Sequence, residues 1–79
     1  MIENEAIAAR IRELCEQNNL TQYALSMKSG VPQSTLSTIM SCTFQSMKIR
    51  IIYEICEGLE IGIKEFFDSP LFERENLID

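Results

Sequence analysis

The sequence predicts an all-α protein built from five helices. Apolar residues recur at helical intervals of three and four along most of the chain, and Asn, Gly and Pro separate these periodic segments. One segment is ambiguous by itself, because the run IRIIYEI from residue 49 is rich in β-branched residues and also resembles a strand. Nothing else in the chain requires a sheet, so the all-α interpretation is favoured.

The first predicted helix carries an apolar stripe. Ile7, Ile11, Leu14 and Cys15 follow each other at intervals of four, three and one, which places them on one face. The helix is expected to end near the run QNN at residues 17–19, since Asn favours helix ends and turns.

The next segment predicts two short helices joined by a tight turn. Thr21 is expected to cap a second helix through residues 22–28, with Leu20 and Leu25 as apolar anchors on either side of the cap. Gly30 suits the left-handed backbone that ends such a helix. Pro32 then fits the first turn of a third helix. This pattern predicts a helix-turn-helix motif.

The third helix, expected at residues 32–40, has two contrasting faces. At about 100° per residue, a polar strip roughly 140° wide lies opposite an apolar face. The core-facing residues are Thr35, Leu36, Ile39 and Met40. The polar strip consists of Gln33, Ser34, Ser37, Thr38 and Ser41.

A fourth and a fifth helix are predicted after a loop. The fourth, within residues 47–59, has its core residues at helical spacing: Ile49, Ile52, Cys56 and Leu59. The fifth, within residues 61–69, has three core residues: Ile63, Phe66 and Phe67.

The 79 residues are expected to form one domain, with a core at 4–68 and an acidic tail at 69–79. Apolar residues such as Leu71, Phe72 and Leu77 alternate with acids in this tail. It can therefore dock as a last turn or short helix, join a dimer contact, or fray.

The net charge of −5 is unevenly distributed. Residues 1–16 carry −2 and residues 54–79 carry −6, whereas residues 17–53 carry +3 and contain no acid at all. Such asymmetry can mark a face for a polyanion. A short polar segment can equally lack acids by chance or for reasons of helix packing.

Several classes of function are disfavoured. The chain has no His, no Gly-rich phosphate loop and three Cys, so neither an enzyme nor a metal or cofactor site is expected. Cys15 and Cys56 lie on apolar stripes and are expected to be buried structural thiols, while Cys42 lies in a predicted loop where a reactive role is open. No apolar run approaches the roughly 18 residues of a membrane span, and the N-terminus is acidic, which predicts a cytoplasmic protein.

The run IRELCEQNNLTQYALSMKSGVPQSTLSTIM at residues 11–40 resembles the DNA-binding domain of phage Cro and repressor-type helix-turn-helix regulators, the XRE family. The matching elements, in order and spacing, are Arg10–Leu14, Thr21–Gln22, Leu25–Ser26, Ser29–Val31 and Gln33–Ser37. The run ICEGLEIGIKEFF at residues 55–67 resembles the last two helices of the family.

This resemblance implies a five-helix, lambda-repressor-like fold. It also implies a sequence-specific transcriptional regulator that binds double-stranded DNA as a homodimer on a palindromic site. Neither a small-molecule ligand nor a membrane partner is implied.

The resemblance places the helix at 32–40 in the major groove. The implied base contacts are Gln33, Ser34, Ser37 and Thr38, and the implied phosphate contacts are Arg10, Gln22, Ser41, Thr43 and Gln45. A Gln amide can both donate to and accept from one adenine edge, whereas a short hydroxyl bonds to many partners and specifies weakly. Gln22 corresponds to a family position that also braces the first Gln of the recognition helix.

The loop after the recognition helix departs from the family pattern. Relatives usually have Gly and Lys there and a Pro opening the next helix, but this chain has SCTFQSMK at residues 41–48. Fewer cations weaken phosphate binding. Phe44 can fill a contact with another subunit or a neighbouring groove, or pack on its own helices. These features leave a second hypothesis open: a protein-binding module of the antitoxin or adaptor kind, with exposed Phe44 and Phe72 and weak DNA affinity.

Overall fold

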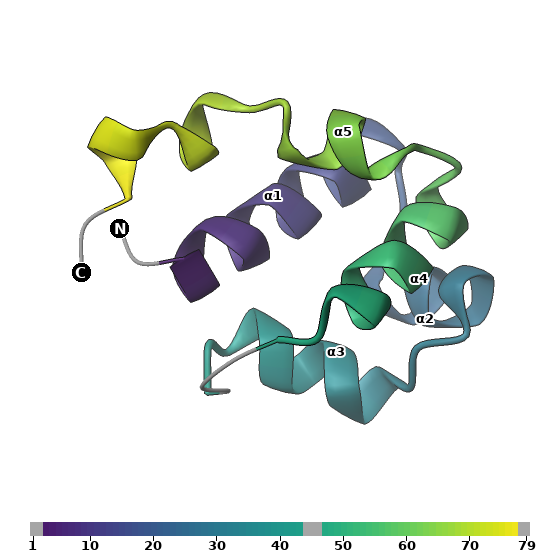
Figure 1. Ribbon diagram of the computed structural model, residues 1–79. Helices are drawn as coiled ribbons and strands as arrows, with labels where there is room; N and C mark the ends of the chain where they lie inside the picture. The colour runs from purple at the N-terminus through teal and green to yellow at the C-terminus, as the bar shows by residue number, and fades with distance from the viewer. Residues whose placement is uncertain (1–2, 44–46, 78–79) are drawn as a thin grey trace.

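The computed structural model describes residues 3–43 and 47–77, and within them the all-α prediction is confirmed. Five α-helices follow in order: α1 Glu3–Gln17, α2 Gln22–Ser29, α3 Gln33–Met40, α4 Ile49–Leu59 and α5 Ile63–Phe67. Two 3₁₀ helices, η1 Pro70–Phe72 and η2 Arg74–Asn76, complete the described chain (Figure 1). No strand occurs in these ranges, so the ambiguous run at residue 49 is helical.

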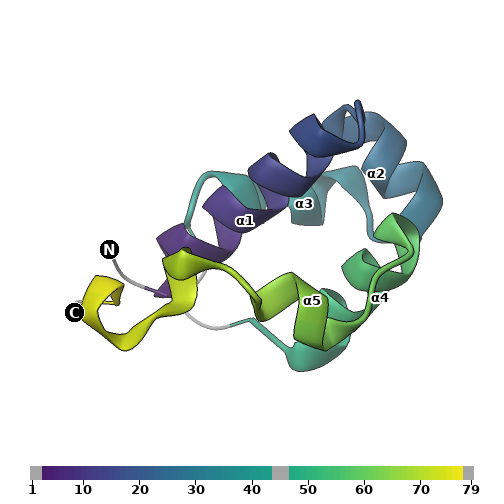
Figure 2. The ribbon, with the colours of Figure 1, turned by 90° about the horizontal axis from the view of Figure 1, so that it is seen from above.

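A single hydrophobic core joins the helices. α1 contacts α3 and η1, α2 contacts α3 and α4, and α4 contacts α5, so the helices enclose one centre (Figure 2). The buried core residues come from all five helices and the turn before α3: Ile11, Leu14, Leu25, Val31, Leu36, Ile39, Ile52, Ile55, Cys56, Leu59 and Phe66.

The contact between α4 and α2 depends on Gly58. This glycine is buried, and a Cβ added to it would lie 2.7 Å from the Cβ of Ser29 and 2.8 Å from its Cα. No side chain fits in that space, so α4 rests directly on the last residue of α2. The sequence pattern alone did not single out Gly58.

Two details of the predicted helices are wrong. α3 begins at Gln33 and not at Pro32, because Pro32 has ψ 145 and forms the N-cap instead of the first turn. Ile49 is not a core residue: it is the first residue of α4, at the edge of the packed region, and is 61% exposed. Ile55, fully buried, takes its place in the core stripe.

Arg10 connects α1 to α5 in the interior. Its Nε donates to the carbonyl of Phe66 at 2.6 Å and its Nη2 to that of Glu65 at 2.8 Å, while Nη1 pairs with Glu13. The last carbonyls of a helix lack partners within the helix and carry its negative dipole end. A buried guanidinium therefore satisfies the end of α5, which has only five residues.

The C-terminal tail docks against α1, the first of the three alternatives. The Phe72 ring lies 4.8 Å from that of Phe67 and 6.1 Å from that of Phe66, between centroids. Phe72 is half-buried by these contacts, so the prediction of an exposed Phe72 is wrong. Asn76 also donates to the Pro70 carbonyl at 2.7 Å and closes the tail on itself.

Candidate nucleic-acid interface

The first helix of the helix-turn-helix, α2, is capped by a threonine at its start and is ended by a glycine. The Thr21 hydroxyl accepts from the backbone N–H of Ala24 at 3.0 Å, which confirms the predicted N-cap. Gly30 has φ 78 in the left-handed region and donates its N–H to the Ser26 carbonyl, which confirms the predicted helix end.

Two serines hold the turn between α2 and α3. The Ser26 hydroxyl donates to the Val31 carbonyl at 2.9 Å, and the Ser29 hydroxyl accepts from the Val31 N–H at 3.2 Å. The Val31 side chain is 2% exposed and anchors the turn in the core. The direction in which α3 leaves α2 is therefore set by two serine side chains that bond to the N–H and the carbonyl of one buried residue.

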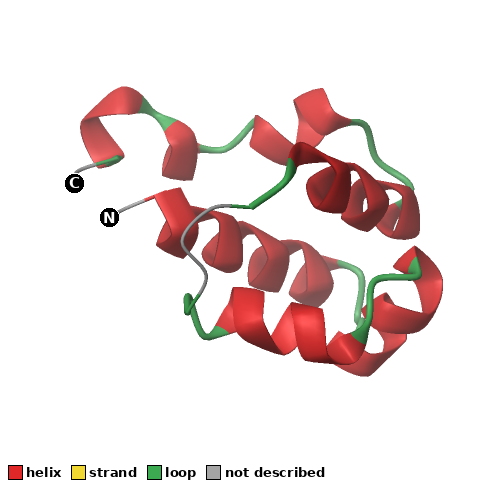
Figure 3. Cartoon of the chain, turned by 60° about the horizontal axis from the view of Figure 1, so that its bottom comes forward, coloured by secondary structure: helices red, strands yellow, loops and turns green. Residues whose placement is uncertain are grey.

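α3 presents its polar strip to solvent, as the helical periodicity predicted. Leu36 and Ile39 are buried beneath it. The five strip residues are all exposed: Gln33, Ser34, Ser37, Thr38 and Ser41. Figure 3 shows α3 along one side of the molecule, with the C-terminal segment on the other side of α1. The acidic tail thus lies away from this surface.

Gln22 braces α3 at a different residue from the one expected. Its Nε2 donates to the Ser37 hydroxyl at 2.9 Å, so its described partner is Ser37 in the second turn of α3 and not Gln33. The bond joins the first residue of α2 to the exposed face of α3. Among the described contacts, none engages the Gln33 side chain. Both the donor and the acceptor of its amide are therefore left for a partner outside the protein.

The hydroxyls at the end of α3 bond to nearby backbone carbonyls and, in one pair, to each other. Thr38 donates to the Ser34 carbonyl at 3.0 Å, and Ser41 donates to the Thr38 carbonyl at 3.0 Å. The Thr43 hydroxyl lies 3.0 Å from that of Ser41, a pair in which either oxygen can donate, and it also donates to the Thr38 carbonyl at 3.4 Å. These bonds hold the first residues after α3 close to the helix.

One of the predicted phosphate-contacting residues, Arg10, stands apart from this surface. Arg10 is 7% exposed and its guanidinium is engaged by α5 and Glu13, so its position does not support a phosphate contact. Gln45, like Phe44, lies outside the described residues. The predicted contacts that the structure does bring to one face are Gln22, Gln33, Ser34, Ser37, Thr38, Ser41 and Thr43.

The charges near α2 and α3 suit a polyanion. Residues 17–53 contain no Asp or Glu, and the three cations of this stretch, Lys28, Lys48 and Arg50, are all exposed. Arg50 approaches Glu54 at 3.7 Å, but its side chain is 84% exposed, so the pair is weakly held. An anionic partner would meet no carboxylate on the α3 strip.

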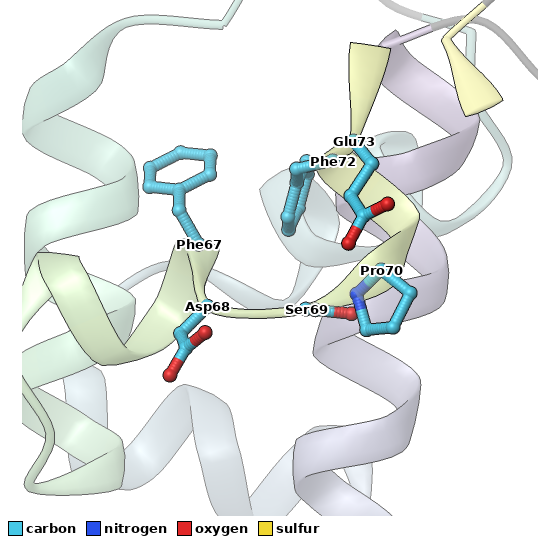
Figure 4. A pocket seen from close by; sticks show the side chains of 6 residues that line it. All are labelled: Phe67, Asp68, Ser69, Pro70, Phe72 and Glu73. Carbon is cyan, nitrogen blue, oxygen red and sulfur yellow. The ribbon is translucent and has the colours of Figure 1, made fainter. Parts of the chain in front are cut away.

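A cavity of about 360 Å³ lies elsewhere, beside the link between α5 and η1 (Figure 4). The rings of Phe67 and Phe72 lie on one side of this link, and the Asp68 carboxylate points to the other side. Glu73 adds a second carboxylate to the lining. This cavity lies on the other side of α1 from α3, and two carboxylates line it. It is therefore not part of the α3 surface.

The three cysteines differ in environment. Cys56 is 1% exposed and Cys15 is half-buried, and burial raises the pKa of both thiols above the ordinary value. Cys42, half-buried in the turn after α3, has φ 59 in the left-handed region, and its Sγ lies 3.8 Å from the Asn4 carbonyl. Among the described helices, none combines the length and the apolar character needed to cross a membrane.

A capped helix, a turn anchored by a buried valine and a second helix with an exposed, acid-free hydrogen-bonding face define a helix-turn-helix DNA-binding domain. The chain belongs to the family of the Cro/C1-type HTH DNA-binding domain, which matches residues 10–70. This is the class of DNA-binding transcriptional regulators that the sequence resemblance implied.

The fold is similar to that of the restriction-modification controller protein C.Esp1396I in two crystal structures. A point mutant of that protein superposes with a TM-score of 0.76 at 23% identity, covering 86% of this chain and 87% of that chain. The wild-type protein superposes with a TM-score of 0.73 at 23% identity, covering 82% and 83% respectively. At this identity the likeness shows the fold alone. No curated protein sequence matches the chain significantly.

Proposed function

We propose that the protein is a cytoplasmic, sequence-specific transcriptional regulator that lays α3 in the major groove of double-stranded DNA. The observation that carries this proposal is the exposed polar strip on α3, free of acids and held in place from α2 by the Gln22–Ser37 bond. An α-helix fits the width of the major groove, where each base pair presents a distinct pattern of donors and acceptors.

The proposed base contacts are Gln33, Ser34, Ser37 and Thr38. Gln33 has the leading role, because its amide can bind the two adjacent groups of an adenine edge and discriminate by about 1–3 kcal/mol. Phosphate contacts are proposed for Gln22 at the N-terminus of α2, for Ser41 and Thr43 after α3, and for Gln45. A helix N-terminus favours an anion through its free N–H groups. We assign Arg10 to the packing of α5 instead.

A homodimer on a palindromic site is part of this proposal. One domain with short polar side chains and few cations makes weak contacts by itself. Two copies related by a two-fold axis, reading half-sites about 34 Å apart, would add their contacts. The structural likeness to a restriction-modification controller protein fits a regulator of this size.

A second function, a protein-binding module, is favoured by one observation. Among the residues that the structure describes, four large apolar side chains are more than half exposed, at i and i+4 on two contacting helices: Tyr23 and Met27 on α2, and Ile49 and Tyr53 on α4. Together with the net charge of −5, they offer a surface for a protein partner. DNA binding weakens steeply with salt, whereas an apolar protein contact does not.

The deciding experiment is selection from a random-duplex library at low salt. The wild-type protein is expected to enrich a palindrome, and Gln33→Ala is expected to lose it while Gln17→Ala, an exposed Gln on α1, retains it. Affinity for the enriched site should fall steeply between 50 and 200 mM salt. If no duplex is enriched even at low salt, the regulator proposal is refuted and the protein-binding module takes its place.

A further inference from the structure

Ser37 and Thr38 are neighbours on the polar strip, but their hydroxyls are engaged in opposite senses. The Ser37 hydroxyl accepts a hydrogen bond from Gln22 Nε2 at 2.9 Å. The Thr38 hydroxyl donates its hydrogen to the Ser34 carbonyl at 3.0 Å. A hydroxyl has one hydrogen to donate and two lone pairs to accept with, so an internal bond decides which of these is left for a ligand.

For Ser37 the hydrogen and one lone pair are left, and the bond accepted from Gln22 polarises the hydroxyl and so strengthens it as a donor. Its described side-chain partner is an amide N–H, which can only donate, so the serine is held as the acceptor of that pair. Turned away from Gln22, its O–H can donate to a group in the groove. For Thr38 the hydrogen is already used by a backbone carbonyl, and only a lone pair faces outward.

We propose that Gln22 is a specificity-determining residue, because the hydrogen bond that it donates strengthens Ser37 as a hydrogen-bond donor toward DNA. This inference rests on the proposed function of α3 in the major groove. A donor selects a base that presents acceptors: guanine offers N7 and O6, whereas cytosine offers the N4 amine, which only donates. The base facing Ser37 is therefore guanine in preference to cytosine. Thr38, as an acceptor, faces a base with an exocyclic amine, cytosine or adenine.

The assignment is compatible with a phosphate contact by the same Gln22. Its amide nitrogen carries two hydrogens, of which one is bound to Ser37 and the second can point to a phosphate oxygen. The Gln22 side chain would then bind a DNA phosphate and, at the same time, favour donation by the Ser37 hydroxyl to a base. A serine at this position, unspecific by its chemistry alone, acquires a defined preference from its neighbour.

The test reverses the sense of this bond. In Gln22→Glu the carboxylate can only accept, so Ser37 must donate to it and present a lone pair to the DNA. The measurement is the ratio of guanine to cytosine in selected duplexes at the position that Ser37→Ala relaxes. Gln17→Glu adds the same charge on α1 without contacting Ser37 and serves as the control.

The wild-type protein and Gln17→Glu are expected to prefer guanine at this position by about 3- to 10-fold, the range of one net hydrogen bond. Gln22→Glu is expected to invert the preference to cytosine, with lower overall affinity. Thr38→Val should relax a neighbouring position while leaving the guanine in place. Thermal melting of each variant checks its folding, which should be preserved because none of these side chains is in the core.

The inference is overturned if Gln22→Glu keeps guanine, if the wild-type protein prefers cytosine, or if Ser37→Ala relaxes no position of an enriched site. Those outcomes leave the proposed regulator intact, since a site is still selected. If the wild-type protein selects no site at all, the proposed function fails first and this inference fails with it.

Discussion

Arg10 Nε lies 2.6 Å from the carbonyl oxygen of Phe66, and this bond ties together residues 56 positions apart in the chain. The same guanidinium binds the Glu65 carbonyl. Because α5 has five residues and little helical stability of its own, its position depends on this anchor and on the buried Phe66 ring. An arginine that resembles a DNA contact by sequence is therefore a structural residue by its environment.

We expect Arg10→Met to lower the free energy of unfolding by about 2–4 kcal/mol, because the Phe66 carbonyl loses its donor and Glu13 loses its ion-pair partner. The Glu65 carbonyl would keep only the backbone N–H of Asp68, at 3.2 Å. Arg12→Met, on the exposed face of the same helix, should change it by less than about 0.5 kcal/mol. Urea denaturation measures both. A stable Arg10→Met protein with weakened DNA binding would instead favour the phosphate contact that the sequence predicted.

Gly58→Ala is expected to destabilise the protein by about 1–3 kcal/mol. The new Cβ would lie 2.7 Å from the Cβ of Ser29, and α4 would have to move away from α2. Gly62→Ala is the matched control, since nothing lies within 4 Å of its added Cβ, and it should cost no more than about 0.5 kcal/mol. Thermal unfolding distinguishes the two. Equal effects would show that α4 does not depend on this close approach.

Glu60→Gly is expected to stabilise the protein by about 1 kcal/mol. Glu60 is exposed at the C-cap of α4 with φ 60 and ψ 41, a left-handed conformation that glycine adopts without strain. Its carboxylate also lies at the negative end of the helix dipole. Glu60→Gln removes the charge alone and should recover only a few tenths of a kcal/mol. If Gln stabilises as much as Gly, backbone strain is not the cause.

Stability should decline as the pH rises past about 9. Burial raises the pKa of the Cys15 and Cys56 thiols above 9.0, so the folded protein holds these protons more firmly than the unfolded chain does. The contribution of these protonated thiols to stability is complete below the pKa that they have in the unfolded chain. It is lost as the pH rises through their pKa in the folded protein. Unfolding followed from pH 7 to 10.5 should show a shallower decline in Cys15→Ala. A decline equally steep in that variant would exclude Cys15 as a source.

Local features of the sequence predicted local structure well. The Thr21 cap, the left-handed Gly30 and the two faces of α3 are all confirmed, because each depends on contacts within a few residues. The errors at Pro32 and Ile49 fall at helix starts, where periodicity carries little information.

The sequence by itself determined the all-α fold, the helix-turn-helix and the exposed polar strip, since helical periodicity and turn chemistry are written in neighbouring residues. Only the tertiary structure decided what distant residues do to one another. It buried Arg10 against α5, packed Phe72 on Phe66 and Phe67, placed Gly58 against Ser29, and bonded Gln22 to Ser37 in place of Gln33. The reason is geometric: which side chains meet across helices depends on how those helices cross, and spacing within one helix does not contain that information.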